Sequence, residues 1–193
     1  RSEAEAVAPD AARCYTGKVS DQMPAWFAAV DAIVAIVSLG AVVRLIAPHL
    51  GSKESDPAVI VVDEAAQFVI PVLSGHLGGA NALAGHLAGA LGATPVLTTA
   101  SDARQTLAVD LLGRELGWVF EATHAELVRC SAAVVNDEAV ALVQEAGRRD
   151  WWANHANGRP GPLPANLTLF EKLEDVDADH FAAIHVLLPD HVE

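Results

Sequence analysis

The sequence predicts an α/β fold, in which a three-layer α/β/α domain with a largely parallel sheet plus a β-hairpin is followed by a smaller α/β domain. Runs rich in β-branched residues alternate with apolar residues at helical spacing as far as about residue 122, which is typical of layered α/β domains. Hydrophobic residues make up 52% of the 193 residues and charged residues 19%, which indicates a folded core. Because the pattern changes near Thr123, we predict one domain over residues 1–122 and a second over 123–193.

The first strand and helix follow each other directly. The run "DAIVAIVS", residues 31–38, has β-branched residues at alternate positions and predicts a strand buried on both faces, as in parallel sheets. A short helix is expected before it, over residues 24–30. The following "LGAVVRLIAPHL", residues 39–50, places apolar residues on one helical face, and Pro48 should weaken that helix near its end.

A hairpin and a second helix come next. The β-rich runs 58–63 and 68–73 are separated by only four residues, a link that permits a hairpin but no parallel crossover. Pro71 inside the second run predicts an edge strand or a bulge. After a glycine-rich loop, Asn81 is expected to cap a helix that ends at Gly92. The apolar positions of that helix are Leu83, Leu87 and Leu91.

The remaining elements are shorter. "TPVLTT", residues 94–99, predicts a strand, and Leu107, Leu111, Leu112 and Leu116 predict a helix over residues 106–117. "WVF" at 118–120 predicts a strand, and residues 126–132 predict a helix. The run "AVVNDEAVALV" is interpreted as a hairpin around Asn136 and Asp137. Residues 158–164 predict a loop, and "NLTLF" and "FAAIHVLLP" predict two final strands.

Composition excludes several classes of function. A formal net charge of −13 argues against nucleic-acid binding, which depends on clustered Lys and Arg. The longest uncharged apolar stretch, residues 32–43, is shorter than the about 20 residues of a membrane-spanning helix. Two cysteines far apart without a CxxC pair fit reduced thiols in the cytoplasm. The histidines lack HxxxH and HExxH spacing, so we predict no metal site and no cofactor.

The loop "LSGHLGG", residues 73–79, is the first candidate site. If a strand ends at Leu73 and a helix begins near Asn81, backbone N–H groups of the intervening glycines, Gly75, Gly78 and Gly79, lack partners beyond the sheet edge. Such groups bind carboxylate or phosphate oxygens, or the oxyanion of a tetrahedral intermediate. Its spacing matches neither a P-loop, nor GxGxxG, nor the GxSxG nucleophile motif. Ser74 and His76 are either turn and capping residues or a functional pair.

Polar and basic residues elsewhere could complete such a site. "TTASD", residues 98–102, closes another strand at the expected edge, and its side chains could either bind a polar ligand or cap the next helix. Its candidate ligand-binding residues are Thr98, Thr99 and Asp102. Arg44 and Lys53 are the nearest candidates for a local basic patch on this acidic protein.

Several ordered motifs carry a resemblance to a known family. "GAVVRLIAPHL", "SDPAVIVVDE", "VLSGHLGGAN" and "LGATPVLTTASD" closely resemble the cobalt-precorrin-5A hydrolases of cobalamin biosynthesis, the CbiG family, over roughly residues 31–117. The later "VVNDEAVALV" is similar to the family's central region. "EAAQF" lacks the turn glycine usual in the family's hairpin, and "TTASD" stands where "TTATD" is more common. The family's first strand and C-terminal domain are expected to be missing from this sequence.

The resemblance implies hydrolysis of the ring-A δ-lactone of a cobalt-corrinoid substrate with release of acetaldehyde. It also implies other cobalamin-pathway enzymes, or a fused methyltransferase, as partners. Under this hypothesis His76 is the base, Gly78 and Gly79 stabilise the oxyanion, and Ser74 orients water or His76. The substrate would be held by Asn81, Thr98, Thr99, Asp102, Gly75, Arg44 and Lys53. The alternatives are a noncatalytic corrinoid carrier and, on the glycines alone, a nucleotide-binding protein.

Overall fold

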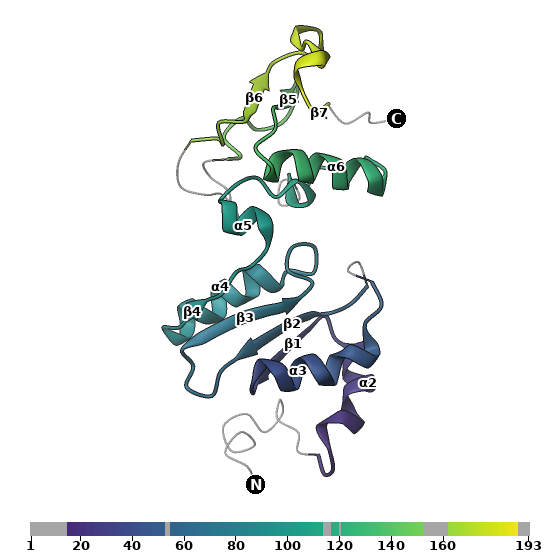
Figure 1. Ribbon diagram of the computed structural model, residues 1–193, viewed down its shortest axis with the longest axis vertical. Helices are drawn as coiled ribbons and strands as arrows, with labels where there is room; N and C mark the ends of the chain where they lie inside the picture. The colour runs from purple at the N-terminus through teal and green to yellow at the C-terminus, as the bar shows by residue number, and fades with distance from the viewer. Residues whose placement is uncertain (1–14, 53–54, 114–116, 120, 153–161, 189–193) are drawn as a thin grey trace.

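The described residues form two β-sheets, which are joined by a short helical connection (Figure 1). The computed structural model describes residues 15–52, 55–113, 117–119, 121–152 and 162–188. Predictions that fall on residues 1–14, Lys53, 114–116, Phe120 and 158–161 lie outside the described residues. Mixed helices and strands with parallel pairings confirm the predicted α/β class.

The first sheet has the order β1-β2-β3-β4. Its strands are β1 (Ala32–Ile36), β2 (Ala58–Val62), β3 (Phe68–Leu73) and β4 (Thr94–Pro95). β1 runs parallel to β2, β2 and β3 form the predicted antiparallel hairpin, and β4 runs parallel to β3. The hairpin register shifts between Val59 and Ile60, opposite the segment that contains Pro71, which confirms the predicted bulge.

Helices cover both faces of this sheet (Figure 1). α2 (Val19–Ala29) and α3 (Leu39–Ile46) pack side chains such as Met23 and Val42 against one face, and α3 passes into a 3₁₀ turn, η1 (Ala47–His49), at Pro48 as expected. α4 (Ala80–Leu91) covers the other face with Ala80, Ala84 and Ala88. The three layers position the β3–α4 loop at one end of the sheet.

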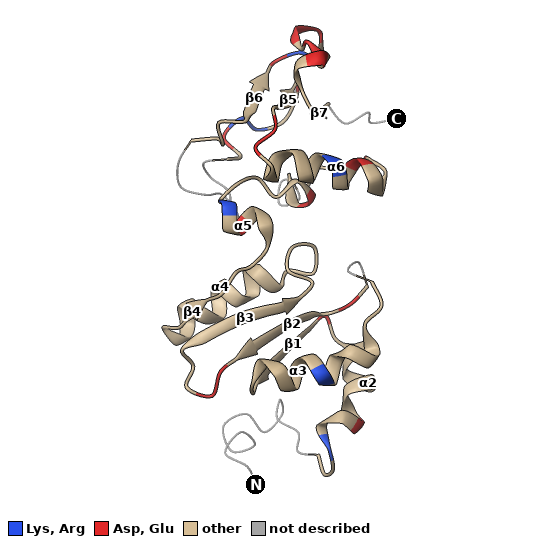
Figure 2. Cartoon of the chain, in the orientation of Figure 1, with Lys and Arg blue, Asp and Glu red and all other residues tan. Residues whose placement is uncertain are grey.

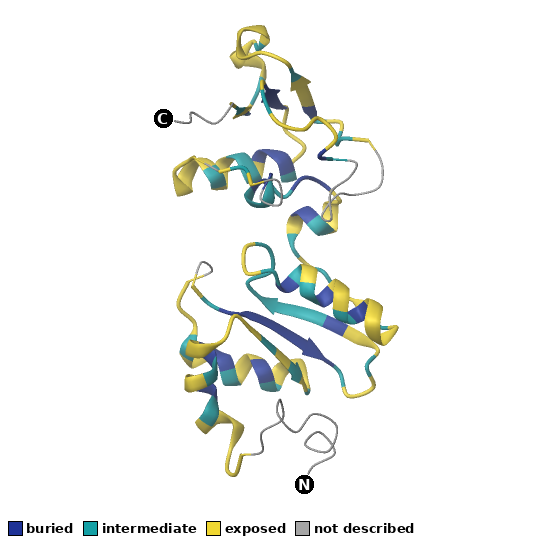
Figure 3. Cartoon of the chain, turned by 180° about the vertical axis from the view of Figure 1, so that it is seen from behind, coloured by how far each residue is buried: buried dark blue, intermediate teal, exposed yellow. Residues whose placement is uncertain are grey.

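The strand that is buried on both faces is β2, and the prediction of such burial for residues 31–38 was wrong. Figure 3 shows β2 buried along its length. β1 alternates between exposed and half-buried positions, and Ile36 is 70% exposed. Among the described strands, β1 pairs with β2 alone, so its apolar composition reflects one covered face beside α2 and α3.

The N-cap of α4 lies two residues before the predicted Asn81. Its N-cap is Gly79, whose φ of 80° lies in the left-handed region, so Asn81 lies in the first turn and does not cap the helix. Gly92 ends the helix in the left-handed conformation, as expected. The small residues face the sheet, while Leu91 is 49% exposed. Asn81 is thereby free to point its side chain toward the next connection.

The connection between the sheets differs most from the prediction. Instead of one helix over residues 106–117, the chain forms α5 (Ala100–Arg104) and a 3₁₀ turn, η2 (Val109–Leu111). Gln105 adopts φ 52° and ends α5. Leu107 is buried in the core of the second sheet and Leu112 packs against that core, so the leucine spacing matched a helical stripe by coincidence. Trp118 and Val119 form no strand, and the ring of Trp118 lies against Gly113.

The second sheet is wholly parallel, with the order β6-β5-β7. It comprises β5 (Val140–Gln144), β6 (Leu167–Phe170) and β7 (Ala183–Leu187), with the 3₁₀ turns η4 (Leu173–Asp175) and η5 (Ala178–His180) between the last two. The strands predicted from "NLTLF" and "FAAIHVLLP" are confirmed. The core of this unit includes Val134, Leu142 and Trp151.

α6 (His124–Val135) precedes this sheet and confirms the predicted helix. It begins with a capping box between Thr123 and Glu126 and extends beyond the predicted residues 126–132. The predicted hairpin around Asn136 was wrong, because the apolar residues before it complete α6 and only those after it form β5. The domain boundary at residue 122 stays a prediction.

Candidate active site

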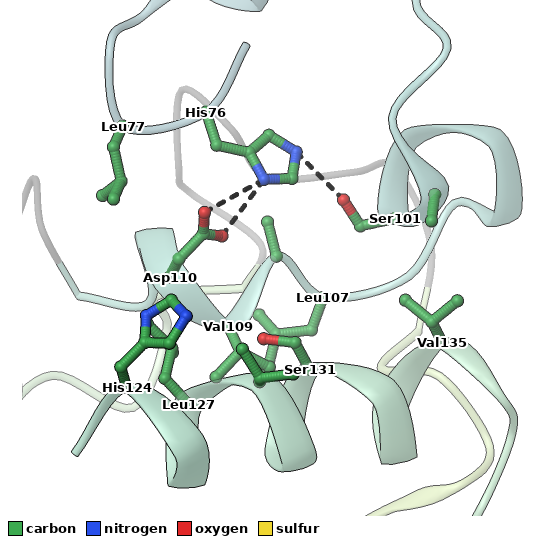
Figure 4. A pocket seen from close by; sticks show the side chains of 13 residues that line it. His76, Leu77, Ser101, Leu107, Val109, Asp110, His124, Leu127, Ser131 and Val135 are labelled. Carbon is green, nitrogen blue, oxygen red and sulfur yellow. Dashed lines mark hydrogen bonds and ion pairs between the residues drawn. The ribbon is translucent and has the colours of Figure 1, made fainter. Parts of the chain in front are cut away.

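The imidazole of His76 lies between residues from two other segments (Figure 4). His76 belongs to the loop after β3. Its Nδ1 lies 3.1 Å from Oδ1 and 3.2 Å from Oδ2 of Asp110, on η2. Its Nε2 lies 3.1 Å from Oγ of Ser101 and 3.4 Å from Oδ2 of Asp102, both on α5. Both ring nitrogens therefore face oxygen atoms.

The two carboxylates hold a proton on His76. Hydrogen bonding to Asp102 and then to Asp110 raises the pKa of His76 from 6.5 to about 9, and partial burial opposes the rise. At neutral pH the ring is therefore an imidazolium. The base role predicted for His76 requires the neutral ring, which this arrangement leaves as a minor species at pH 7.

A polar network holds Asp102 in place. Asn81 Nδ2 donates to Asp102 Oδ2 at 2.7 Å and to Thr99 Oγ1 at 3.0 Å. The Thr99 hydroxyl also donates to Asp102 Oδ2. Oδ2 of Asp102 thus accepts from α4 and from its own turn while it faces His76. The structure brings Asn81, Thr99 and Asp102 together with their polar groups turned toward each other, and their role in substrate binding stays a prediction.

A cavity of about 260 Å³ opens beside His76. One side is the β3–α4 loop, with His76 and Leu77, and the opposite side is the face of α6 (Figure 4). Its polar lining comes from His76, Ser101, Asp110, His124 and Ser131, and its apolar lining includes Leu107, Val109, Leu127 and Val135. The cavity therefore combines an apolar wall with a proton-bearing cluster, as small-molecule sites commonly do.

Ser74 has a structural role. Its Oγ donates to the carbonyl oxygen of Asp56 at 2.9 Å, and its backbone takes φ 56°. A Cβ at Gly78 would collide with Ser74, so the turn requires glycine at that position. Gly75 lies close to Asn81, because a Cβ there would approach its Oδ1 to 2.8 Å. The predicted contact between Ser74 and His76 is absent among the described hydrogen bonds.

The backbone N–H groups that were predicted to lack partners in the loop are partly used by the chain itself. Gly79 N–H donates to the carbonyl of His76 at 2.9 Å, and Ala80 N–H donates to that of Ser74 at 3.1 Å. The oxyanion role predicted for Gly79 is therefore corrected, since its donor is already used. Within the described part of the chain, the N–H of Gly78 has no such backbone acceptor and stays a candidate.

Arg44, the described member of the predicted basic patch, does not line the cavity. Arg44 is exposed on α3, on the sheet face opposite α4, and its Nη1 donates to the carbonyl of Gly40. Lys53 lies outside the described residues. Thr98 is exposed and does not line the cavity. Figure 2 shows how sparse basic residues are, and Arg104 on α5 forms an ion pair with Asp137.

Sequence reasoning missed Ser101 and Asp110. Ser101 lies inside the "TTASD" motif, beside the predicted Asp102. The motif pointed to this segment, but nothing in the sequence indicated that Ser101 contacts His76. Asp110 stood within a predicted helix and carried no motif. Only the break between α5 and η2 turns Asp110 toward His76.

Two further structural findings bear on the site. No helix in the described ranges is long and apolar enough to cross a membrane. Among the same residues, no group of three or more His, Cys, Asp and Glu side chains is arranged to hold a metal ion.

Comparison with known proteins identifies matching regions. The family model "Cobalamin synthesis G N-terminal" matches residues 21–102, and "Cobalamin biosynthesis central region" matches residues 107–159. The chain is 44% identical over 173 residues to a cobalt-precorrin-5A hydrolase of Priestia megaterium, covering 89% of this chain and 45% of that protein. It is 40% identical over 126 residues to the protein of the same name from Salmonella typhimurium strain LT2, covering 65% and 34%.

The chain thus spans less than half the length of each of these two relatives. A solved structure of a cobalamin biosynthesis protein G homologue from Sulfolobus solfataricus matches with a TM-score of 0.46 and 24% identity, over 85% of this chain and 47% of that one. His76, Ser101 and Asp102 lie in the N-terminal region and Asp110 in the central region.

Proposed function

Because the chain carries the N-terminal and central regions of the CbiG family, and so belongs to that family, we propose that it hydrolyses the ring-A δ-lactone of cobalt-precorrin-5A. Opening of the lactone frees the extruded meso carbon, which leaves with its methyl group as acetaldehyde. Both curated relatives carry the name cobalt-precorrin-5A hydrolase. The observation that carries the proposal is the His76 imidazole, held between two carboxylates at the edge of a cavity.

Lactone hydrolysis requires a group that moves protons. A nucleophile must lose a proton, the carbonyl oxygen must be stabilised as it becomes negative, and the leaving oxygen must gain a proton. His76 can exchange a proton with groups in the cavity, because Asp110 fixes its ring and Ser101 faces its other nitrogen. The N–H of Gly78 is the remaining candidate oxyanion donor of the loop.

The size of the cavity limits how the substrate binds. A volume of about 260 Å³ is small for a whole corrinoid macrocycle, because sites that enclose drug-sized ligands already occupy about 300–1,000 Å³. We expect the lactone edge of ring A to enter and the remainder of the ring system to lie outside. The apolar wall from Leu107 and Leu127 suits the ring edge, and His124 and Ser131 on α6 are placed to meet polar substituents.

We place the protein in the cytoplasm, among other enzymes of cobalamin biosynthesis or fused to a methyltransferase of that pathway. The named function of both curated relatives supports a biosynthetic setting. Cobalt belongs to the substrate and is not a resident metal of the protein.

Acetaldehyde release tests the proposal. The purified chain is incubated anaerobically with cobalt-precorrin-5A, and acetaldehyde is measured with time. We expect turnover by the unmodified chain and at least about a 100-fold loss in His76→Gln, since proton-transfer groups contribute about 10²–10⁴-fold. Ser38→Ala is a matched control, because Ser38 precedes α3 and its side chain makes no capping hydrogen bond. Binding of the corrinoid without acetaldehyde would favour the carrier alternative.

A further inference from the structure

Three side chains form one continuous hydrogen-bonded row at the cavity. The Ser101 hydroxyl meets Nε2 of His76 at 3.1 Å, and Nδ1 on the other side of the same ring meets Asp110 at 3.1 Å (Figure 4). A serine, a histidine and an aspartate in this order of contact recur on unrelated folds, and they are recognised by geometry because their order along the chain varies. Here the chain order is His76, Ser101, Asp110.

Ser101 is the serine whose surroundings suit nucleophilic attack. It is only 3% exposed as a residue, yet it lines the cavity. Within the described residues, its hydroxyl has His76 Nε2 as its hydrogen-bond partner and no other. Ser74 differs, because its hydroxyl is committed to the Asp56 carbonyl. Ser131 lines the same cavity from α6, without a hydrogen bond to the histidine among those described.

We propose that Ser101 is a catalytic nucleophile, activated by His76 and oriented through Asp110, and that lactone hydrolysis passes through an acyl-enzyme. This inference rests on the proposed function for its substrate. Ser101 Oγ bonds to the lactone carbonyl carbon while its proton moves to His76 Nε2. The bond from that carbon to the ring oxygen then breaks, and the leaving oxygen takes the proton. Water adds next, gives a proton to Nε2, and releases the acid as Ser101 Oγ leaves and regains that proton.

Asp102, together with Asp110, sets the pH at which this row works. The titratable groups that face His76 or its cavity are Asp102 on α5, Asp110 on η2 and His124 on α6. Asp102 faces the same nitrogen as Ser101, at the longer distance of 3.4 Å, and stabilises the charged ring. Ser101 is therefore activated in the fraction of molecules whose ring is neutral. We assign Asp102 a positioning role, and its removal should move activation to lower pH.

Labelling with an alkyl fluorophosphonate tests the nucleophile without the natural substrate. We expect one adduct per chain, located at Ser101 by peptide mass mapping. The labelling rate should rise with pH, and the midpoint of this rise should lie at about pH 9. Ser101→Ala should abolish the adduct and His76→Gln should slow labelling at least about 100-fold. Asp102→Asn should shift the midpoint to lower pH. Ser38→Ala, with a serine at the start of α3, should label as the unmodified chain does.

The outcomes separate this inference from the proposed function. Absence of an adduct from the folded unmodified chain at pH 9.5, or an adduct on another serine, overturns the nucleophile. Acetaldehyde release that persists within about threefold in Ser101→Ala also overturns it, while the hydrolase assignment stands. An adduct on Ser101 in a chain that releases no acetaldehyde supports the nucleophile and rejects cobalt-precorrin-5A as its substrate.

Discussion

His76 links the ionisation of one side chain to the stability of the whole chain. Its ring is 19% exposed and contacts both Asp102 and Asp110, so the folded state binds the proton more tightly than the unfolded chain does. A group whose pKa is raised on folding stabilises the protein fully below its unfolded pKa, and that contribution is lost as the pH rises through the folded pKa.

The free energy of unfolding should therefore fall between about pH 6.5 and pH 9. The difference between the two pKa values corresponds to about 3 kcal/mol. Urea unfolding at pH 6, 7.5 and 9.5 measures it. His76→Gln is the control and should flatten this slope; an equally steep slope in that variant would mean that another group causes it.

Gly78 is a second residue whose role can be tested directly. Because a Cβ there would meet both Cβ and the carbonyl oxygen of Ser74, Gly78→Ala must displace the loop that carries His76. We expect a loss of about 1–3 kcal/mol in the free energy of unfolding, as in other overpacked sites. Chemical denaturation measures the change, and an unaltered midpoint would show that the loop relaxes without cost.

At this scale the sequence singled out His76, whose catalytic role stays a prediction, and it listed Asp102 as a site residue but missed Ser101 and Asp110. Ser74 is two residues away along the chain, yet the left-handed turn at that residue points it to Asp56. Ser101, Asp102 and Asp110, which contact the ring, are 25, 26 and 34 positions distant. Contacts over such separations depend on the chain path, which residue spacing alone does not determine.

Helix α4 offers a matched test at the scale of one element. Gly85 lies in the helix interior, with open space around its would-be Cβ. Gly85→Ala should raise the free energy of unfolding by about 0.5–1 kcal/mol, because alanine restricts the unfolded chain and favours the helix. The opposite signs expected for Gly85→Ala and Gly78→Ala make each the control of the other. Destabilisation by Gly85→Ala would reveal a contact on that helix face.

The end of β5 depends on one buried amide. Gln144 is 3% exposed, donates to the carbonyls of Ala146 and Arg148, and accepts from the indole N–H of Trp151 at 3.1 Å. Gln144→Leu leaves these groups unpaired and should cost about 2–3 kcal/mol. Gln67→Leu, at an exposed position before β3, is the control and should stay within about 0.5 kcal/mol. Similar unfolding midpoints for both variants would contradict this account.

Elements with strong local signals were predictable and the connections were not. The β2–β3 hairpin followed from a link too short for a crossover, and the helix predicted over residues 126–132 lies within α6. The helix predicted over residues 106–117 was wrong because the leucines at helical spacing do not share one helix face. Leu107 is instead buried under the second sheet. Tertiary packing overrode a weak local preference.

The acidity of the whole molecule should affect how a substrate rich in carboxylates approaches. The formal net charge is −13, and the cavity lining contains no Lys or Arg among the described residues. Raising the ionic strength from 0.01 to 0.15 M shortens the Debye length from about 30 Å to about 8 Å, which screens the repulsion. Under the proposed function, the kcat/KM for cobalt-precorrin-5A should therefore increase with salt.

Steady-state kinetics over that salt range measures this effect, and labelling by an uncharged fluorophosphonate is the control, which should not change. A decrease in kcat/KM with salt would show instead that a basic residue such as Arg44 or Lys53 attracts the substrate. The direction of the salt effect thus tests whether the basic patch predicted from the sequence attracts the substrate.

His76, Ser101 and Asp110 come from a loop, a single helical turn and a 3₁₀ turn, not from the interior of either sheet. Short connections open more readily than buried strands such as β2 and β5. On gentle warming, turnover should therefore vanish while circular dichroism still reports intact sheets. The protein would lose its activity at a temperature below its unfolding transition, and cooling would restore that activity.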